Sequence, residues 1–352
     1  MQNKEMTLLK ALGIIFVVMG HKYEVFSWFQ VYSFHMALFF FVSGYFYKEE
    51  SETNILSYIY KKVKKTIPIY FLFNFIYMIV TNIINKKYNV SLANIKSFKD
   101  FFIMPFISGH QVALFLPAWF MMALLIIQVI FIMLYKNMKK VNKNMNIHLL
   151  IFICIGFCGT YIAKYTQLTF DSTILIVVRT CFGLFFYYLG FYYRKHESNK
   201  IFNSKILFVM FLIQIVILIQ GNDIKYVVVW GQFHGAIILP YIIGINGIYL
   251  YLFISKALAK LIPDNDVLYK IGSHTMSIMM HHMFVFFIIN YVIVKVTNGD
   301  RGQLGDVWFS YNLNTFWPIY IGLGVLLPVI SSILIEKIKI YILKLNKNYK
   351  YI

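Results

Sequence analysis

The chain has 352 residues, of which 60% are hydrophobic and only 13% are charged, and its mean hydropathy is +0.67. This composition excludes an ordinary soluble domain, because apolar runs of roughly 18 or more residues between lysine-rich gaps are typical of transmembrane helices. The runs are also too long and too uniformly apolar for the strands of a membrane barrel. The net charge of +19 does not indicate a nucleic-acid partner, since the lysines lie in short loops between the runs.

The sequence therefore predicts an all-α fold, a polytopic transmembrane helical bundle that forms a single domain, 1–352, with no separate soluble domain. About ten spans are expected, near residues 7–24, 30–47, 67–85, 114–135, 147–164, 173–193, 205–220, 236–255, 274–295 and 315–336. Of the 33 Lys and Arg residues, 23 lie on the side that carries both termini, nine on the other, and Arg179 inside a span. By the positive-inside rule both termini are predicted to be cytoplasmic, in a multi-pass protein of the cell membrane.

The first two spans each carry a histidine in their outer half. KALGIIFVVMGHK contains His21 and VYSFHMALFFFVSGYF contains His35, so both rings are expected at similar depth on adjacent helices. Titratable side chains in a membrane usually face the bundle interior or a wet cavity. For His35, a purely structural hydrogen bond to a neighbouring helix stays open as the alternative. Glu24, at i+3 from His21, is either a carboxylate that orients the His21 ring or an exposed acid of the loop.

Two basic features precede these candidates at the cytoplasmic side. Lys10 and His21 are eleven residues apart, which places them about 16 Å apart on one helical face. A pantetheine arm with its phosphates at the membrane surface has about that reach, although Lys10 could simply follow the positive-inside rule. Similarly, the run KKVKKTIP before the third span is either a contact for anionic lipid or a binding site for the phosphates of a cytoplasmic cofactor.

Later spans add further ionisable groups. Arg179 lies about six residues into the sixth span, where a buried guanidinium needs an anionic or carbonyl partner. The pair His281 and His282 lies in the ninth span, with His282 roughly 12 Å above its cytoplasmic start. Spans 1, 2, 6 and 9 are therefore expected to converge on one polar pocket. The three cysteines fall inside spans without metal-ligand spacing, so no metal is expected.

These segments resemble the acyltransferase-3 family, membrane proteins that move acyl groups onto sugars and other hydroxyl acceptors, and most closely its fucose 4-O-acetylase-like branch. The first segment is similar to a family helix in which a basic residue and a histidine are separated by ten positions, here Lys10 and His21. The second is similar to the second-helix signature and departs chiefly at Ala37, where proline is common. KKVKKTIPIY carries Lys62 and Lys65 where arginines are frequent.

Weaker similarity continues through PAWFMMALL, the Arg179 helix and IGSHTMSIMMHHMF, in which His282 rather than His281 falls at the usual histidine position. The resemblance implies a membrane O-acyltransferase, most simply an O-acetyltransferase. It would move an acyl group from cytoplasmic acetyl-CoA to a hydroxyl of a cell-surface sugar, exopolysaccharide or other glycan.

The resemblance also implies residue roles. His21 would act as general base or transient acyl carrier, and His35 would position the acceptor or share its proton. Arg179 would stabilise the oxyanion of the tetrahedral intermediate. The CoA phosphates would bind Lys10, Lys62 and Lys65. Supporting or acceptor-binding roles, including the stacking of sugar rings on tryptophan, are expected for Glu24, Ser43, Trp119, Trp230, His282 and Trp308.

One rival interpretation belongs to another class of protein. A transporter or flippase for a glycan or small anion could use the same buried histidines and arginine as a coupling site. Consumption of acyl-CoA separates the two functions. The expected partners are acyl-CoA, a sugar or polysaccharide acceptor and the lipid bilayer, and a homodimer is a possible assembly.

Overall fold

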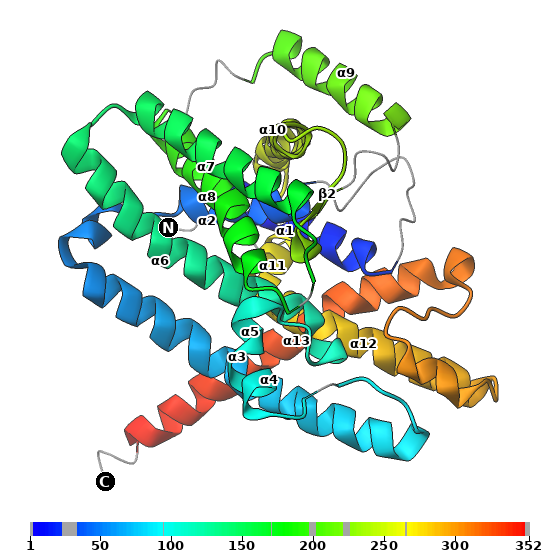
Figure 1. The fold of residues 1–352 in the computed structure, drawn as a ribbon. Helices are drawn as coiled ribbons and strands as arrows, with labels where there is room; N and C mark the ends of the chain where they lie inside the picture. Colours follow the sequence, from blue (N-terminus) through cyan, green and yellow to red (C-terminus); the bar gives the residue numbers. More distant parts are fainter. Residues whose placement is uncertain are drawn as a thin grey trace.

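The computed structural model of the chain describes residues 3–22, 34–93, 95–169, 171–196, 202–220, 226–264 and 266–348 (Figure 1). These residues form an all-α polytopic helical bundle with one two-stranded hairpin. The elements in chain order are α1 (Lys4–Gly20), α2 (His35–Tyr45), η2 (Glu49–Asn54), α3 (Ile55–Tyr88), α4 (Phe98–Phe102), α5 (Met104–Ile107), η3 (Ala113–Ala118), α6 (Trp119–Val141), α7 (Met145–Tyr165), α8 (Ile174–Lys195), α9 (Ser204–Gln220), β1 (Tyr226–Val227), η6 (Val228–Trp230), β2 (Gln232–Phe233), α10 (Leu239–Leu261), α11 (Val267–Ser273), α12 (Thr275–Val296), η7 (Arg301–Gly305) and α13 (Leu313–Asn348).

Each of the ten predicted spans coincides with a helix. In the described part of the chain, seven helical segments are long and apolar enough to cross a membrane, and α2 and α9 are shorter apolar helices. The predicted ends differ most for α3, which has 34 residues and continues through Pro68. At 1.5 Å per residue it is about 51 Å long, more than the hydrocarbon core of a bilayer requires.

The second predicted span, 30–47, is helical only over His35–Tyr45 in its described part. Eleven residues rise about 16 Å, roughly half the hydrocarbon thickness. The helix is nevertheless stable inside the bundle, because α1, α8 and α10 surround it and eight of its residues are buried.

Two glycines allow α2 and α8 to approach closely. A Cβ atom at Gly190 would overlap the carbonyl oxygen of Phe41, and one at Gly44 would overlap the carbonyl oxygen of Tyr187. Small residues at helix contacts permit this kind of backbone approach in membrane bundles. The two helices therefore touch along their backbones rather than through long side chains.

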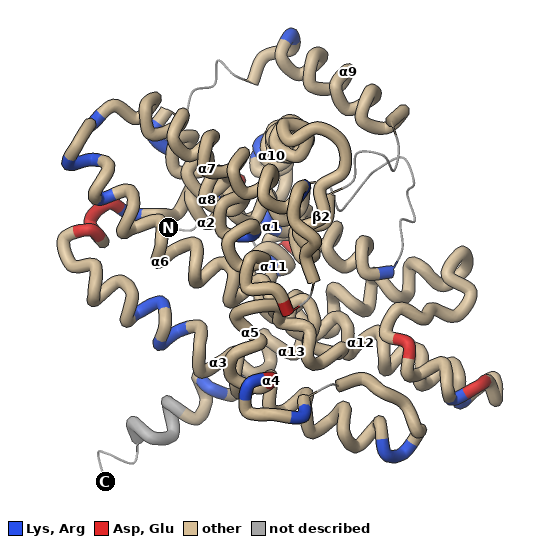
Figure 2. The backbone as a smooth tube through the Cα atoms, viewed as in Figure 1, with Lys and Arg blue, Asp and Glu red and all other residues tan. Residues whose placement is uncertain are grey.

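Basic residues gather at one end of the bundle. Figure 2 shows Lys and Arg along the N-terminal half of α3 and near the C-terminal ends of α6 and α8. Here Lys139 on α6 pairs with Glu49 at 3.2 Å and Glu52 at 2.6 Å, and Lys195 on α8 also pairs with Glu49. This end is the one that the charge distribution predicts to be cytoplasmic.

Short elements close the opposite end. They are α4, α5, η3, the β1–η6–β2 hairpin and η7. Gly109, at φ +73°, lets the segment after α5 pass close to α6, since a Cβ atom there would lie 2.6 Å from Cβ of Trp119.

Candidate active site

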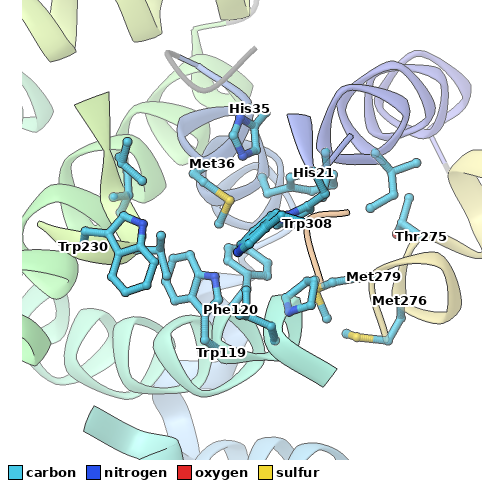
Figure 3. Close-up of a pocket in the computed structure, with 18 residues that line it drawn as sticks. His21, His35, Met36, Trp119, Phe120, Trp230, Thr275, Met276, Met279 and Trp308 are labelled. Atoms are coloured by element: carbon cyan, nitrogen blue, oxygen red, sulfur yellow. The ribbon is translucent and has the colours of Figure 1, made fainter. Parts of the chain in front are cut away.

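A cavity of about 210 Å³ lies among α1, α2, η3, α6, η6, α12 and the segment that follows η7. Its walls are mainly apolar and aromatic, with His21 and His35 as its titratable lining residues (Figure 3). Lining residues that Figure 3 labels are His21, His35, Met36, Trp119, Phe120, Trp230, Thr275, Met276, Met279 and Trp308. An apolar cavity with a few convergent polar groups is the usual form of a small-molecule site.

His21 lies directly after α1, where the last turn of the helix presents its ring to α12. The ring centroids of His21 and His282 are 5.1 Å apart. Nδ1 of His282 lies 2.7 Å from the carbonyl oxygen of Ile278, so Nδ1 carries the hydrogen and donates it. Nε2 of the neutral His282 ring is then a hydrogen-bond acceptor, buried and without a hydrogen-bond partner among the described residues.

The structure therefore brings three of the predicted histidines together. His21 and His35 line one cavity, and His282 contacts His21 from behind the wall. His281, one position earlier on α12, faces α3 instead, where its Nδ1 lies 2.7 Å from the Tyr77 hydroxyl oxygen. His282 therefore belongs to the site, whereas its neighbour His281 joins α12 to α3.

Trp308 covers the His21 ring. The two rings are stacked, with centroids 5.6 Å apart and an interplanar angle of 20°. Figure 3 shows the two side chains next to each other in the cavity. Trp230 lies on the other side of the cavity and stacks on His110 at 4.8 Å. Both tryptophans that were expected to stack on sugar rings are therefore in the lining.

Arg179 is buried beside the cavity and does not line it. Its guanidinium donates to the carbonyl oxygens of Ile107 at 2.8 Å, of Ser108 at 3.4 Å and of Val229. The same group lies 4.7 Å from the ring centroid of Trp119, which is a lining residue. Arg179 thus joins the end of α5 to η6, which lines the cavity, and its predicted contact with an oxyanion stays a prediction.

His110, which the sequence did not single out, lies next to Arg179 in the loop between α5 and η3. Nδ1 of His110 donates to the carbonyl oxygen of Ser108 at 2.7 Å. Burial, and secondly the charge of Arg179, lower the pKa of His110 to about 4. The ring is therefore neutral at pH 7. Its only sequence signal was a lone histidine in the longest predicted loop.

The three lysines predicted to bind CoA phosphates lie away from the cavity lining. Lys10 is half-buried on α1, eleven residues before His21. Lys62 is half-buried on α3 with its ammonium 5.3 Å from the ring centroid of Tyr58, while Lys65 is exposed. All three lie toward the basic end of the bundle, and phosphate binding there stays a prediction.

Of the residues expected to support the site, one lines the cavity and another lies away from it. Trp119 lines the cavity, but Ser43 lies near the C-terminal end of α2, where it accepts a hydrogen bond from Gln128 at 3.0 Å. Ser43 is therefore far from His35 on the same helix. Glu24 lies outside the described residues.

Lys22, which the sequence analysis did not single out, follows His21 directly and is only 1% exposed. Hydropathy cannot reveal this burial, because a lysine that follows an apolar run looks like the start of a loop.

The fold and cavity define a class of protein: a polytopic membrane helical bundle that encloses a histidine-lined cavity beneath its outer loops. A family model described as an acyltransferase domain matches residues 3–335. The chain belongs to this family, the acyltransferase-3 family, and is a membrane acyltransferase of the kind that carries out O-acylation. No individually curated protein and no solved structure matches the sequence significantly.

Proposed function

We propose that the protein transfers an acyl group, most simply acetyl, from acyl-CoA to a hydroxyl group of a sugar or glycan. The position of the cavity carries this proposal. Thr275, at the first turn of α12, lines it, as do Trp230 and Trp308 from segments at the other end of the bundle. A donor that arrives from one side of the membrane and an acceptor from the other would therefore meet beside His21.

The chemistry follows from the imidazole rings. His21 would take the proton of the acceptor hydroxyl while the hydroxyl oxygen attacks the thioester carbonyl carbon. The C–S bond then breaks, the ester forms, and the departing CoA thiolate recovers the proton from His21. The ring of His282, whose Nδ1–H donates to the Ile278 carbonyl oxygen, lies 5.1 Å from the ring of His21 and would stabilise the charge that His21 gains with the proton.

Separate groups of residues would bind the donor and the acceptor. Lys10, Lys62 and Lys65 at the basic end would bind the CoA phosphates, and Trp230 and Trp308 would stack on a sugar ring. A fucose 4-O-acetylase-like preference rests on sequence resemblance alone. Transport of a glycan or small anion is the alternative use of the same cavity.

The test uses the full chain in nanodiscs with acetyl-CoA labelled in the acetyl group and a mixed glycan pool as acceptor. Wild type is expected to release CoA and to label the glycans, and His21→Ala to lose at least 100-fold of this rate. His196→Ala is the matched control, because His196 is exposed at the far end of α8. Equal rates in wild type and His21→Ala would remove His21 from the mechanism. Saturable glycan binding without any CoA release would favour transport.

A further inference from the structure

Lys22 places a cation inside the bundle, one residue after His21. Its ammonium donates to the carbonyl oxygen of Phe309 at 2.6 Å. The ring centroids of Phe286 and Tyr320 lie 4.9 Å and 5.3 Å from the same nitrogen. Among the described residues Lys22 forms no close ion pair. The Phe309 carbonyl dipole, two aromatic faces and the more distant charge of Asp306 stabilise its ammonium.

The segment that Lys22 contacts, Asp306–Tyr311, joins η7 to α13, and Trp308 in it is 47% exposed, with one ring face against His21. Asn290 on α12 also donates to the Phe309 carbonyl, at 2.8 Å. Tyr320 on α13 donates to the side-chain oxygen of Asn290 and accepts the backbone N–H of Tyr311 at 3.1 Å. These hydrogen bonds fix the segment against α12 and α13.

The same segment carries Trp308 to the cavity. Trp308 precedes Phe309, the residue anchored by Lys22, and its indole stacks on His21 (Figure 3). Two consecutive residues of α1's end therefore hold two consecutive residues of the segment: His21 contacts Trp308, and Lys22 binds Phe309. The hydrogen bond from the Lys22 ammonium to the Phe309 carbonyl is the stronger of these two contacts, because its donor is charged.

We propose that Lys22 is a positioning residue that fixes Trp308 over His21 and thereby keeps water away from the acyl donor. The reaction part of this proposal rests on the proposed function, whereas the positioning of Trp308 does not. Without the indole, water would attack the thioester carbonyl in place of the acceptor hydroxyl. The C–S bond would break to give the free carboxylic acid and the CoA thiol, so the acyl group would be wasted.

The first experiment measures the position of Trp308 directly. The chain has five tryptophans, so incorporation of 5-fluorotryptophan gives five ¹⁹F resonances, and Trp308→Phe identifies the one from Trp308. We expect Lys22→Met to shift that resonance and Lys22→Arg to restore it, because arginine keeps a charged donor. Lys295→Met, which removes an exposed lysine on the same side of the bundle, is the matched control. A Trp308 resonance unchanged by Lys22→Met would overturn the proposal.

The second experiment measures release of CoA from acetyl-CoA without any acceptor. We expect Lys22→Met and Trp308→Ala each to raise this hydrolysis at least fivefold while labelling of glycans falls. An unchanged hydrolysis rate in a variant whose Trp308 has moved would overturn the water-exclusion role. If Lys22→Met does not fold, Lys22→Gln replaces it in both experiments, and Trp308→Ala still tests the hydrolysis rate. A wild type that consumes no acetyl-CoA would refute the proposed function, and the ¹⁹F shift would still decide the positioning.

Discussion

At the scale of single residues, Arg179 links two segments of the chain through its buried guanidinium. Its fork of N–H groups reaches the carbonyl oxygens of Ile107, Ser108 and Val229, which lie at the end of α5 and in η6, far apart in sequence. Lysine has the same charge but a single donor group without this planar geometry. The residue therefore stabilises these two segments whatever else it does for the reaction.

We expect Arg179→Lys to lower the free energy of unfolding by about 2 kcal/mol, since two charge-assisted hydrogen bonds lose their geometry. Thermal unfolding in detergent measures this, with Arg194→Lys at the end of the same helix as the control. An Arg179→Lys variant with unchanged stability but much slower acyl transfer would instead support the predicted role at the oxyanion.

His110 gives the molecule a sensitivity to acid. Its pKa of about 4 in the folded chain is below the ordinary value of 6.5. Between these values the unfolded chain binds a proton that the folded chain does not, so stability falls as the pH drops from 6.5 toward 4. The full contribution is about 3 kcal/mol. We expect His110→Gln to show a smaller loss of Tm between pH 7 and pH 5 than wild type. Identical pH slopes would contradict this.

At the scale of elements, the contact between α2 and α8 depends on glycine. We expect Gly190→Ala to cost at least about 2 kcal/mol or to prevent folding, because its Cβ atom would meet the Phe41 carbonyl, a backbone atom that cannot turn aside. Gly322→Ala is the control, since nothing lies within 4 Å of a Cβ atom there. Fluorescence-detected size exclusion and thermal unfolding of both variants give the comparison; equal stabilities would show that the two helices can separate without loss.

The sequence predicts these elements well where hydropathy decides them and poorly where packing does. All ten spans coincide with helices, because long apolar runs have few alternatives in lipid. Hydropathy did not reveal that α2 is only eleven residues long, since HMALFFFVSGY is as apolar as a full span. Likewise, the histidines of the first two spans could be expected in one pocket, but the carbonyl partners of Arg179 and Lys22 depend on loop backbone that no residue pattern encodes.

At the scale of the whole molecule, the orientation in the membrane is still a prediction. The three native cysteines lie in α7 and α8 and would first be replaced by alanine. Lys143→Cys, between α6 and α7, is then expected to react with a membrane-impermeant maleimide only after vesicles that keep the cellular orientation are opened. Gln303→Cys in η7 is expected to react while the vesicles are still closed. Both positions are exposed. The reverse labelling pattern would show that the bundle has the opposite orientation, with the proposed donor-binding lysines on the outer side of the membrane.

The glycine contacts between α2 and α8 also imply that one part of the cavity wall is more rigid than the part that carries Trp308. Because their backbones are in close contact, we expect α2 and α8 to move together, so that His35 and Arg179 keep their relative positions. The part of the wall that carries Trp308 is held differently: the Asp306–Tyr311 segment depends on side-chain hydrogen bonds with Lys22, Asn290 and Tyr320. Such bonds can break and re-form without unpacking two helices. The route by which an acceptor enters and a product leaves is therefore expected to open at Trp308, while the α2–α8 side of the cavity stays fixed during turnover.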